Sequence, residues 1–279
     1  MAPRTSTTMK YSKLLLAIAV LAFSDAVSAQ ILINSSGSYS QNFDALPLAG
    51  TSNAWSDNLN LAGWYADKEI GGEVTVISAG TGSSTATSLY SFGSTSSTER
   101  ALGALSSGTS GAFAYGVVFQ NTSALEITFN SFSYRGELWR MGSPAEAETL
   151  EFGYRISTAP ITSALSGTWT DVNALDFTNP NPATPATTGA IDGNLAGNFV
   201  NLSANLNVSL AAGSYLMFRW YDIDHGGADN GLGIDDVAIS YVTNAPVIIA
   251  VPEPSTYGLV AAALLIIGGA YRRWKACEC

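Results

Sequence analysis

Three observations about the amino-acid sequence predict an all-β protein with a single β-sandwich domain. Short runs rich in β-branched and aromatic residues recur along the middle of the chain, and clusters of Gly, Ser, Asn and Pro separate them. Helical periodicity is nearly absent from this part. The stretch from residue 30 to 243 holds about 210 residues, which suits one sandwich domain and its hydrophobic core.

Nine segments have the composition of strands. In chain order they are Val74–Ser78, Ser88–Phe92, Ala112–Gln120, Leu125–Tyr134, Glu148–Ser157, Thr168–Val172, Asn198–Leu206, Ser214–Asp222 and Gly233–Val242. Apolar and polar residues alternate from Ile127 to Tyr134, and the alternation slips near Ser131, where we expect a β-bulge. The proline-rich segment Thr178–Asn194 is predicted to be a long surface loop.

The N-terminus, residues 1–29, has the pattern of a secretory signal peptide. Lys10 and Lys13 precede the apolar run Leu14–Phe23, and small residues stand at Val27 and Ala29. This pattern predicts export by the Sec machinery and cleavage by signal peptidase after Ala29. The alternative is an N-terminal membrane anchor, but a core of about 30 Å needs about 20 apolar residues and this run is shorter.

The C-terminus has three parts in a fixed order. A linker, residues 244–256, contains Pro252, Glu253 and Pro254, and the uncharged run 257–271 follows it. A basic tail, residues 272–279, comes last. The run predicts a transmembrane helix, and the basic residues place its end in the cytoplasm, which leaves the body on the far side of the inner membrane. The simpler alternative is a plain anchor with a stiff proline spacer.

This tail resembles the PEP-CTERM sorting signal of Gram-negative bacteria. The resemblance implies that an exosortase recognises the Pro252-Glu253-Pro254 motif and releases the body to the cell surface or the extracellular space, in exopolysaccharide and biofilm systems. The body also resembles a module of such proteins, through segments such as Tyr134–Arg140 and Gly231–Val237. That resemblance implies an extracellular β-sandwich of the jelly-roll or lectin-like type and no defined activity.

The balance of charges excludes one class of partner. Between Gln30 and Val251 the chain carries 6 basic residues against 19 acidic ones, so this stretch would repel a phosphate backbone. We therefore expect no binding to nucleic acid. A single histidine, His225, makes a Ser-His-Asp hydrolase or a poly-histidine metal centre improbable.

The segment 222–236 is the best candidate for a bound ion. Asp222, Asp224, Asp229, Asn230 and Asp235 supply the oxygen ligands that Ca²⁺ prefers, and glycines between them allow tight turns. The spacing is not that of an EF-hand. The alternative is a hairpin loop in which Asp and Asn only suit the turn. A structural Ca²⁺ is the one cofactor that the sequence suggests.

Catalytic and sugar-binding residues are less clearly marked. Glu137 paired with Glu151 or Glu126, with Trp139 stacked on a sugar ring, would suit a glycosidase. An ion pair between Arg135 and Glu137 is the simpler interpretation. The aromatic residues Trp55, Trp64 and Tyr65 are candidates for stacking on glycan, whereas most tryptophans are expected to fill the core.

Three functional hypotheses follow from these features. The preferred one is a non-catalytic surface or matrix protein, exported, processed by an exosortase and held in the exopolysaccharide, with weak glycan binding. The second is a secreted carbohydrate-active enzyme. The third is a permanently anchored periplasmic binding protein.

Overall fold

The computed structural model describes residues 30–143, 146–180, 188–244 and 254–276. The predicted signal peptide, its cleavage site at Ala29, and Pro252 and Glu253 of the sorting motif lie outside these residues. The described part consists of β-strands, one short 3-10 helix, η1 (Asn173–Leu175), and one α-helix, α1 (Pro254–Ala276).

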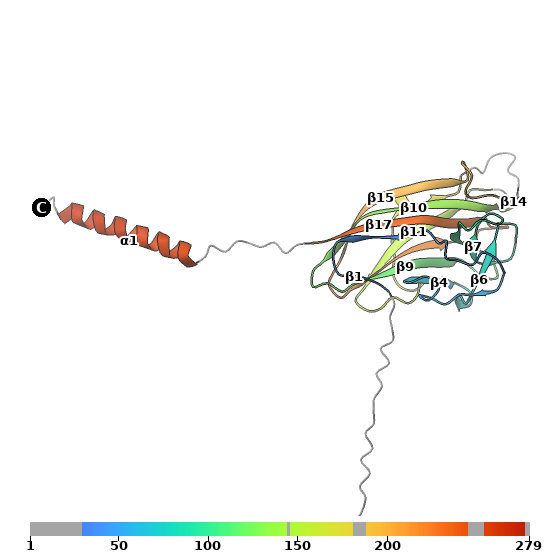
Figure 1. Cartoon of the computed structure of the whole chain (residues 1–279), viewed down its shortest axis with the longest axis horizontal. Coiled ribbons are helices and arrows are strands. Elements are labelled where there is room, and N and C mark those ends of the chain that lie inside the picture. The colour runs from blue at the N-terminus through green and yellow to red at the C-terminus, as the bar shows by residue number, and fades with distance from the viewer. Residues whose placement is uncertain (1–29, 144–145, 181–187, 245–253, 277–279) are drawn as a thin grey trace, which may run out of the picture.

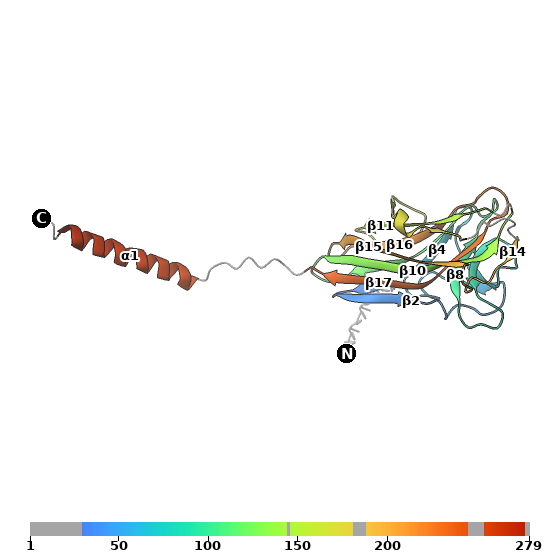
Figure 2. The same ribbon diagram turned by 90° about the horizontal axis from the view of Figure 1, so that it is seen from above.

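The strands form two sheets that lie face to face (Figures 1 and 2). The first sheet contains β1 (Ile31–Ile33), β4 (Trp64–Lys68), β5 (Gly72–Glu73), β9 (Phe113–Asn121), β11 (Thr149–Ser157), β12 (Thr170–Asp171), β13 (Phe177–Thr178) and β16 (Tyr215–Asp222). The second contains β2 (Gly37–Gln41), β3 (Asn53–Ala54), β6 (Val76–Gly80), β7 (Ser88–Phe92), β8 (Ala101–Leu105), β10 (Ile127–Met141), β14 (Gly189–Ala190), β15 (Phe199–Leu210) and β17 (Gly231–Thr243). The prediction of an all-β sandwich is therefore confirmed.

Most pairs of neighbouring strands are antiparallel, and the long strands lie at the centre of each sheet. In the first sheet the order is β12-β11-β16-β9-β4-β5, and in the second it is β14-β10-β17-β8-β7-β6-β3. The register between β10 and its neighbours shifts between Phe129 and Ser131, so the predicted bulge is confirmed. As a result Phe132 and Tyr134 both point into the core.

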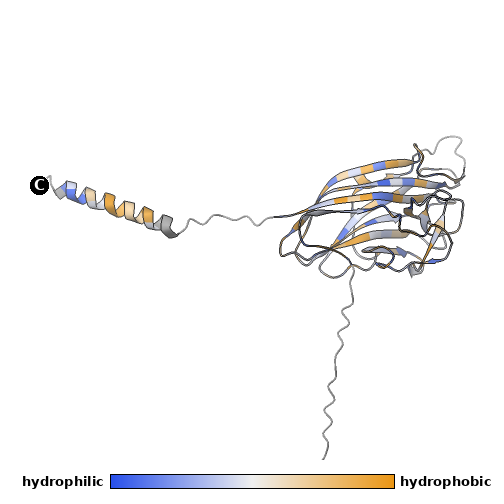
Figure 3. Ribbon diagram, in the orientation of Figure 1, coloured by the Kyte–Doolittle hydropathy of each residue, from blue (hydrophilic) through white to orange (hydrophobic). Residues whose placement is uncertain are grey.

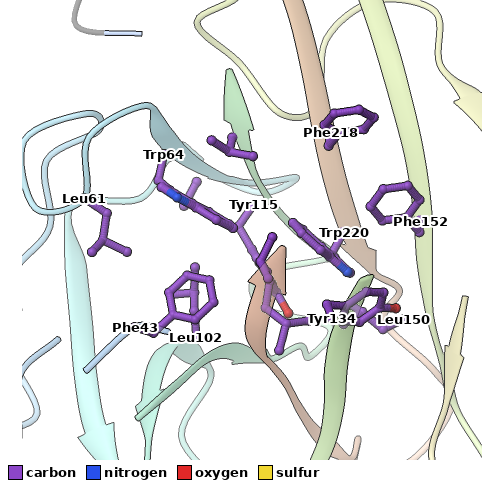
Figure 4. Packing of buried hydrophobic residues seen from close by; sticks show 14 of the residues in the cluster. Phe43, Leu61, Trp64, Leu102, Tyr115, Tyr134, Leu150, Phe152, Phe218 and Trp220 are labelled. Atoms are coloured by element: carbon purple, nitrogen blue, oxygen red, sulfur yellow. The ribbon is translucent and has the colours of Figure 1, made fainter. Parts of the chain in front are cut away.

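A core of aromatic and aliphatic side chains fills the space between the sheets (Figure 4). Trp220 of β16 lies at its centre, with its ring stacked on Trp64 of β4 at a centroid distance of 5.7 Å. Tyr134 and Phe152 meet the same indole edge to face, at 5.3 and 5.2 Å. These rings bury a large apolar area without any disulfide, as the absence of cysteine between residues 30 and 251 requires.

Helix α1 covers the C-terminal segment 257–271 that the sequence predicts to be transmembrane. Within the described ranges, however, no helix combines the length and the apolar character needed to cross a membrane. The transmembrane segment stays an expectation from the sequence. Large apolar residues of the helix are exposed, namely Leu259, Val260, Leu264, Leu265, Ile266 and Ile267, and much of its ribbon has the hydrophobic colour in Figure 3.

A half-buried carboxylate near the start of β4 predicts a specific pH dependence. Burial raises the pKa of Asp57 to about 6, although its Oδ1 accepts hydrogen bonds from the Trp55 indole (2.8 Å) and the Ala66 amide (2.9 Å). A raised pKa means that the folded state binds the proton more tightly than the unfolded state, so this contribution to stability is lost as pH rises from about 4 to about 6.

We therefore expect Asp57→Asn, which keeps the acceptor oxygen and removes the charge, to melt at a higher temperature than the wild type at pH 7. At pH 4 the two proteins should melt at the same temperature. Calorimetric melting temperatures at both pH values check this, and a variant less stable than wild type at pH 7 would contradict it.

Candidate functional site

The connection between β16 and β17 gathers carboxylates at one end of the sandwich. It passes from the first sheet to the second and is therefore not a hairpin, while the alternative that its Asp and Asn residues only suit the turn stays open. Asp222 ends β16, and Asp224, His225 and Asp229 follow in the loop. Glu148, which immediately precedes β11, joins them, with side-chain ligand atoms of Glu148, His225 and Asp229 within 4.8 Å of one another. We call Glu148, Asp222, Asp224, His225 and Asp229 the acidic loop cluster.

Two members of the acidic loop cluster carry buried oxygens without a protein partner. Asp222 is 1% exposed; its Oδ2 accepts a hydrogen bond from the Ser106 hydroxyl (2.9 Å), and its Oδ1 has no partner. Asp229 is 4% exposed; its Oδ1 accepts the His225 amide (3.1 Å), and its Oδ2 has none. Buried polar atoms almost always have partners, so these two oxygens are unusual and are free to accept further contacts.

The electrostatics of the acidic loop cluster favour a positive ion. Burial, together with the neighbouring carboxylates of Glu148 and Asp224, raises the pKa of Asp229 to about 7. The same causes hold the pKa of Asp222 well above its usual value. Like charges that crowd in a partly dry site are costly until a cation or a proton neutralises them.

His225 does not supply a nitrogen ligand through Nδ1. This atom lies 3.0 Å from the carbonyl oxygen of Ile223, and a carbonyl only accepts, so Nδ1 carries the proton. The other four members of the cluster offer carboxylate oxygens, which suit Ca²⁺ better than a transition metal.

The other predicted ligands lie elsewhere or are already engaged. The amide oxygen of Asn230 accepts the Gly142 amide (2.6 Å), and its nitrogen donates to the Glu146 carbonyl (3.0 Å), so Asn230 fastens the loop rather than facing an ion. Asp235 is not part of this cluster. It lies on β17 beside Glu99 and Glu137, on the outer face of the second sheet. Glu148 was missed because nothing in its local sequence indicates a contact with a loop more than 70 residues away.

The proposed catalytic carboxylates are not brought together. Glu137 is fully buried in β10 and hydrogen-bonded to the Trp139 indole, and its oxygen lies 3.9 Å from Arg135, which supports the structural ion pair. Glu151 is on the other sheet, and Glu126 precedes β10, on the order of 30 Å away along the extended strand.

The aromatic residues proposed to stack on glycan are buried. Trp55, Trp64, Tyr65 and Trp139 are at most 6% exposed, so that interpretation is wrong and the expectation that most tryptophans fill the core is confirmed. Half-buried Trp169, which was not singled out, lines an open cavity of about 640 Å³.

The chain is thus a two-sheet β-sandwich that carries the acidic loop cluster at the connection between β16 and β17. No protein-family model and no curated protein matches the chain. Among solved structures, the K3 cleaved adhesin domain of Lys-gingipain from Porphyromonas gingivalis is similar, with a TM-score of 0.35 and 16% identity, over 73% of this chain and 99% of that one. The K2 cleaved adhesin domain of Lys-gingipain gives 0.36 and 12%, over 72% and 97%. The function proposed below therefore rests on the residues of the chain itself.

Proposed function

We propose that the protein is an exported, non-catalytic component of the cell surface or extracellular matrix, sorted by its C-terminal tail. One observation carries this proposal: the Pro252-Glu253-Pro254 motif leads directly into a helix with exposed apolar side chains, which ends on the basic residues Arg273 and Lys275. The N-terminal signal peptide supports export by Sec, and the tail resembles the signal that an exosortase reads.

Mass spectrometry of extracellular material tests the sorting. We expect the extracellular protein to begin at Gln30 and to lack the helix beyond the Pro-Glu-Pro motif. Replacing Pro252, Glu253 and Pro254 by alanine should keep the helix attached, whereas Pro160→Ala, in a loop of the body, should leave processing unchanged. An intact helix on every exported molecule would contradict the proposal, and wild-type protein found only with the inner membrane would favour a permanently anchored binding protein.

We also propose that the acidic loop cluster binds a structural Ca²⁺. The unpartnered oxygens of Asp222 and Asp229 and the raised pKa values support this. The ion would fasten the connection between the two sheets, and its affinity would be that of extracellular modules, with a dissociation constant of about 0.1–1 mM.

A ligand at about 100 times its dissociation constant stabilises a folded protein by about 2.7 kcal/mol. We therefore expect about 10 mM Ca²⁺ to raise the melting temperature by roughly 5–10 °C over EDTA, because about 1 kcal/mol corresponds to about 2–4 °C for a domain of this size. Asp229→Asn should reduce that rise, whereas Asp171→Asn, on the exposed strand β12, should retain it. Equal responses in wild type and Asp229→Asn would exclude the site.

Weak glycan binding is a second candidate function, and the cavity at Trp169 favours it. The Arg219 guanidinium lies 4.0 Å from the Trp169 ring and 4.9 Å from the Tyr221 ring, and Glu69 accepts the Tyr221 hydroxyl (2.6 Å). Aromatic faces suit the C–H face of a sugar, and the Glu69 and Arg219 side chains suit its hydroxyls.

In affinity electrophoresis with exopolysaccharide, Trp169→Ala should abolish retardation and Trp274→Ala, on helix α1, should not. Equal retardation of Trp169→Ala and wild type would contradict binding here.

A further inference from the structure

Three acidic side chains meet on the outer face of the second sheet, away from the acidic loop cluster. Glu137 of β10 and Asp235 of β17 stand on adjacent strands, where Arg135 pairs with Asp235 and Glu137 with Gly233. Glu99, from the loop before β8, lies over them, and one oxygen of each carboxyl group is within 4.8 Å of the others. Glu137 and Asp235 are 0% and 3% exposed. We call Glu99, Glu137 and Asp235 the outer-face cluster.

A bulge in β17 creates this arrangement. The register between β10 and β17 shifts between Ser133 and Arg135, and Asp236 adopts a left-handed backbone with φ of 50°. As a result Asp235 is buried beside Glu137, whereas Asp236 is exposed and lies 3.6 Å from Arg135. A non-glycine residue in this conformation costs about 1 kcal/mol or more, and such strain is common at binding sites.

Each carboxyl group of the outer-face cluster has one buried oxygen left without a hydrogen-bond partner. Glu137 Oε2 accepts the Trp139 indole N–H (2.9 Å), and Glu99 Oε2 accepts the Asn194 side-chain amide. The remaining oxygens, Glu99 Oε1, Glu137 Oε1 and Asp235 Oδ1, have no partner. Three unsatisfied acceptors from three different elements thus lie in one small region.

The positive charge near the outer-face cluster does not balance it. Arg135 lies 3.9 Å from Glu137 but is closer to Asp236 and also stacks over the Phe199 ring at 4.6 Å. Burial and the mutual repulsion of these carboxylates raise the pKa of Glu137 to about 7 and that of Asp235 to about 9. A single shared arginine does not neutralise three carboxylates, so burial favours their protonated forms until a cation binds.

We propose that Glu99, Glu137 and Asp235 bind a divalent cation, Ca²⁺, at a second site that is independent of the acidic loop cluster and of sorting. The donors are all carboxylate oxygens, which a hard cation requires. Oxygens that bind one Ca²⁺ at 2.3–2.6 Å lie up to about 5 Å apart, which matches the observed spacing. The ion joins the loop that carries Glu99 to strands β10 and β17, and so fixes that loop over Trp139.

Terbium luminescence tests this site, because Tb³⁺ replaces Ca²⁺ at oxygen sites and an adjacent indole sensitises its emission. Trp139 donates to Glu137 and is therefore the sensitiser expected here. Purified full-length protein should show Tb³⁺ emission on tryptophan excitation, and excess Ca²⁺ should quench it. Glu137→Gln and Asp235→Asn should reduce this emission at least fivefold, whereas Asp236→Asn, a change at the exposed neighbouring residue, should preserve it.

Melting temperatures give a second readout with an opposite sign in the two buffers. In EDTA, Glu137→Gln and Asp235→Asn should melt at or above the wild-type temperature, because burial disfavours the ionised form of each carboxyl group when no cation is bound. In about 10 mM Ca²⁺ both variants should melt at a lower temperature than the wild type. In the luminescence experiment, Asp229→Asn in the acidic loop cluster should leave the Tb³⁺ emission of the outer-face cluster unchanged. If a buried variant fails to fold, Glu99→Gln, at the half-buried position, carries the same expectations.

Equal emission and equal Ca²⁺ responses in wild type and all three variants would overturn the site. Stabilisation by Mg²⁺ and not by Ca²⁺ would overturn the choice of ion. Both results leave the proposed sorting untouched, because the sorting tail and the outer-face cluster share no residue.

Discussion

Trp220→Ala is expected to lower the free energy of unfolding by about 3–5 kcal/mol, the range for removing a buried Trp from a close-packed core. The indole is fully buried and packs against rings from β4, β10 and β11, so its loss leaves a cavity bounded by both sheets. Because a typical domain is stable by only about 5–15 kcal/mol, the variant should be unfolded or partly unfolded at modest denaturant concentrations.

Urea unfolding followed by circular dichroism measures this effect. Trp274→Ala is the matched control, since Trp274 lies on helix α1 and is 60% exposed, and it should change the free energy of unfolding by less than about 0.5 kcal/mol. If both substitutions shifted the midpoint equally, the core described here would not be the source of stability.

Gly142→Ala is expected to destabilise the protein by about 3 kcal/mol, at the upper end for an overpacked site. A Cβ atom at this position would lie 1.6 Å from the carbonyl oxygen of Ala228, so the backbone must move. Moving it breaks the bridge between Ser143 and Ala228, whose two hydrogen bonds are 2.9 Å, and displaces Asn230. The variant should therefore also lose the Ca²⁺-dependent rise in melting temperature that we assign to the acidic loop cluster.

Gly226→Ala provides the control within the same loop. A Cβ atom there meets no atom within 4 Å, and the backbone does not need the left-handed region, so this substitution should be close to neutral. Calorimetry with EDTA and with Ca²⁺ separates the two effects. A Gly142→Ala protein that melts like Gly226→Ala in both buffers would show that the close approach at Ala228 does not matter.

The long strands could be predicted because runs of β-branched and aromatic residues mark them, and β10 and β15 also alternate between buried and more exposed positions. All nine predicted segments overlap a strand, and β7 was predicted to the residue. Strands β4 and β8 were missed because their composition is weak: Ala101–Leu105 has no β-branched or aromatic residue, and Trp64–Lys68 ends in Ala, Asp and Lys. Short strands at the edges, such as β3 and β14, carry too few residues for any pattern.

The candidate sites were predictable only where their residues are close in sequence. Asp222 at the end of β16 and Asp224 and Asp229 in the following loop lie close enough for their carboxylates to influence one another. Asp235 was assigned to the same group, but it follows the start of β17 and turns to the outer face at a bulge. Glu99 and Glu148 join their clusters because the folded sheets bring distant segments together. The spacing of residues along the sequence does not indicate such contacts. The glycan-stacking interpretation of Trp55, Trp64 and Tyr65 failed because composition does not tell which side of a strand faces solvent.

Strand β17 pairs with strands from both the beginning and the middle of the chain. It pairs with β10 on one side and with β8 and β2 on the other, and the Thr243 amide donates to the Ser36 hydroxyl across 207 positions of the chain (2.9 Å). The domain consequently cannot complete this sheet progressively from its N-terminus. Residues 37–41 and 101–105 pair with a strand that comes almost at the end of the domain, and such long-range pairing makes folding slow and cooperative.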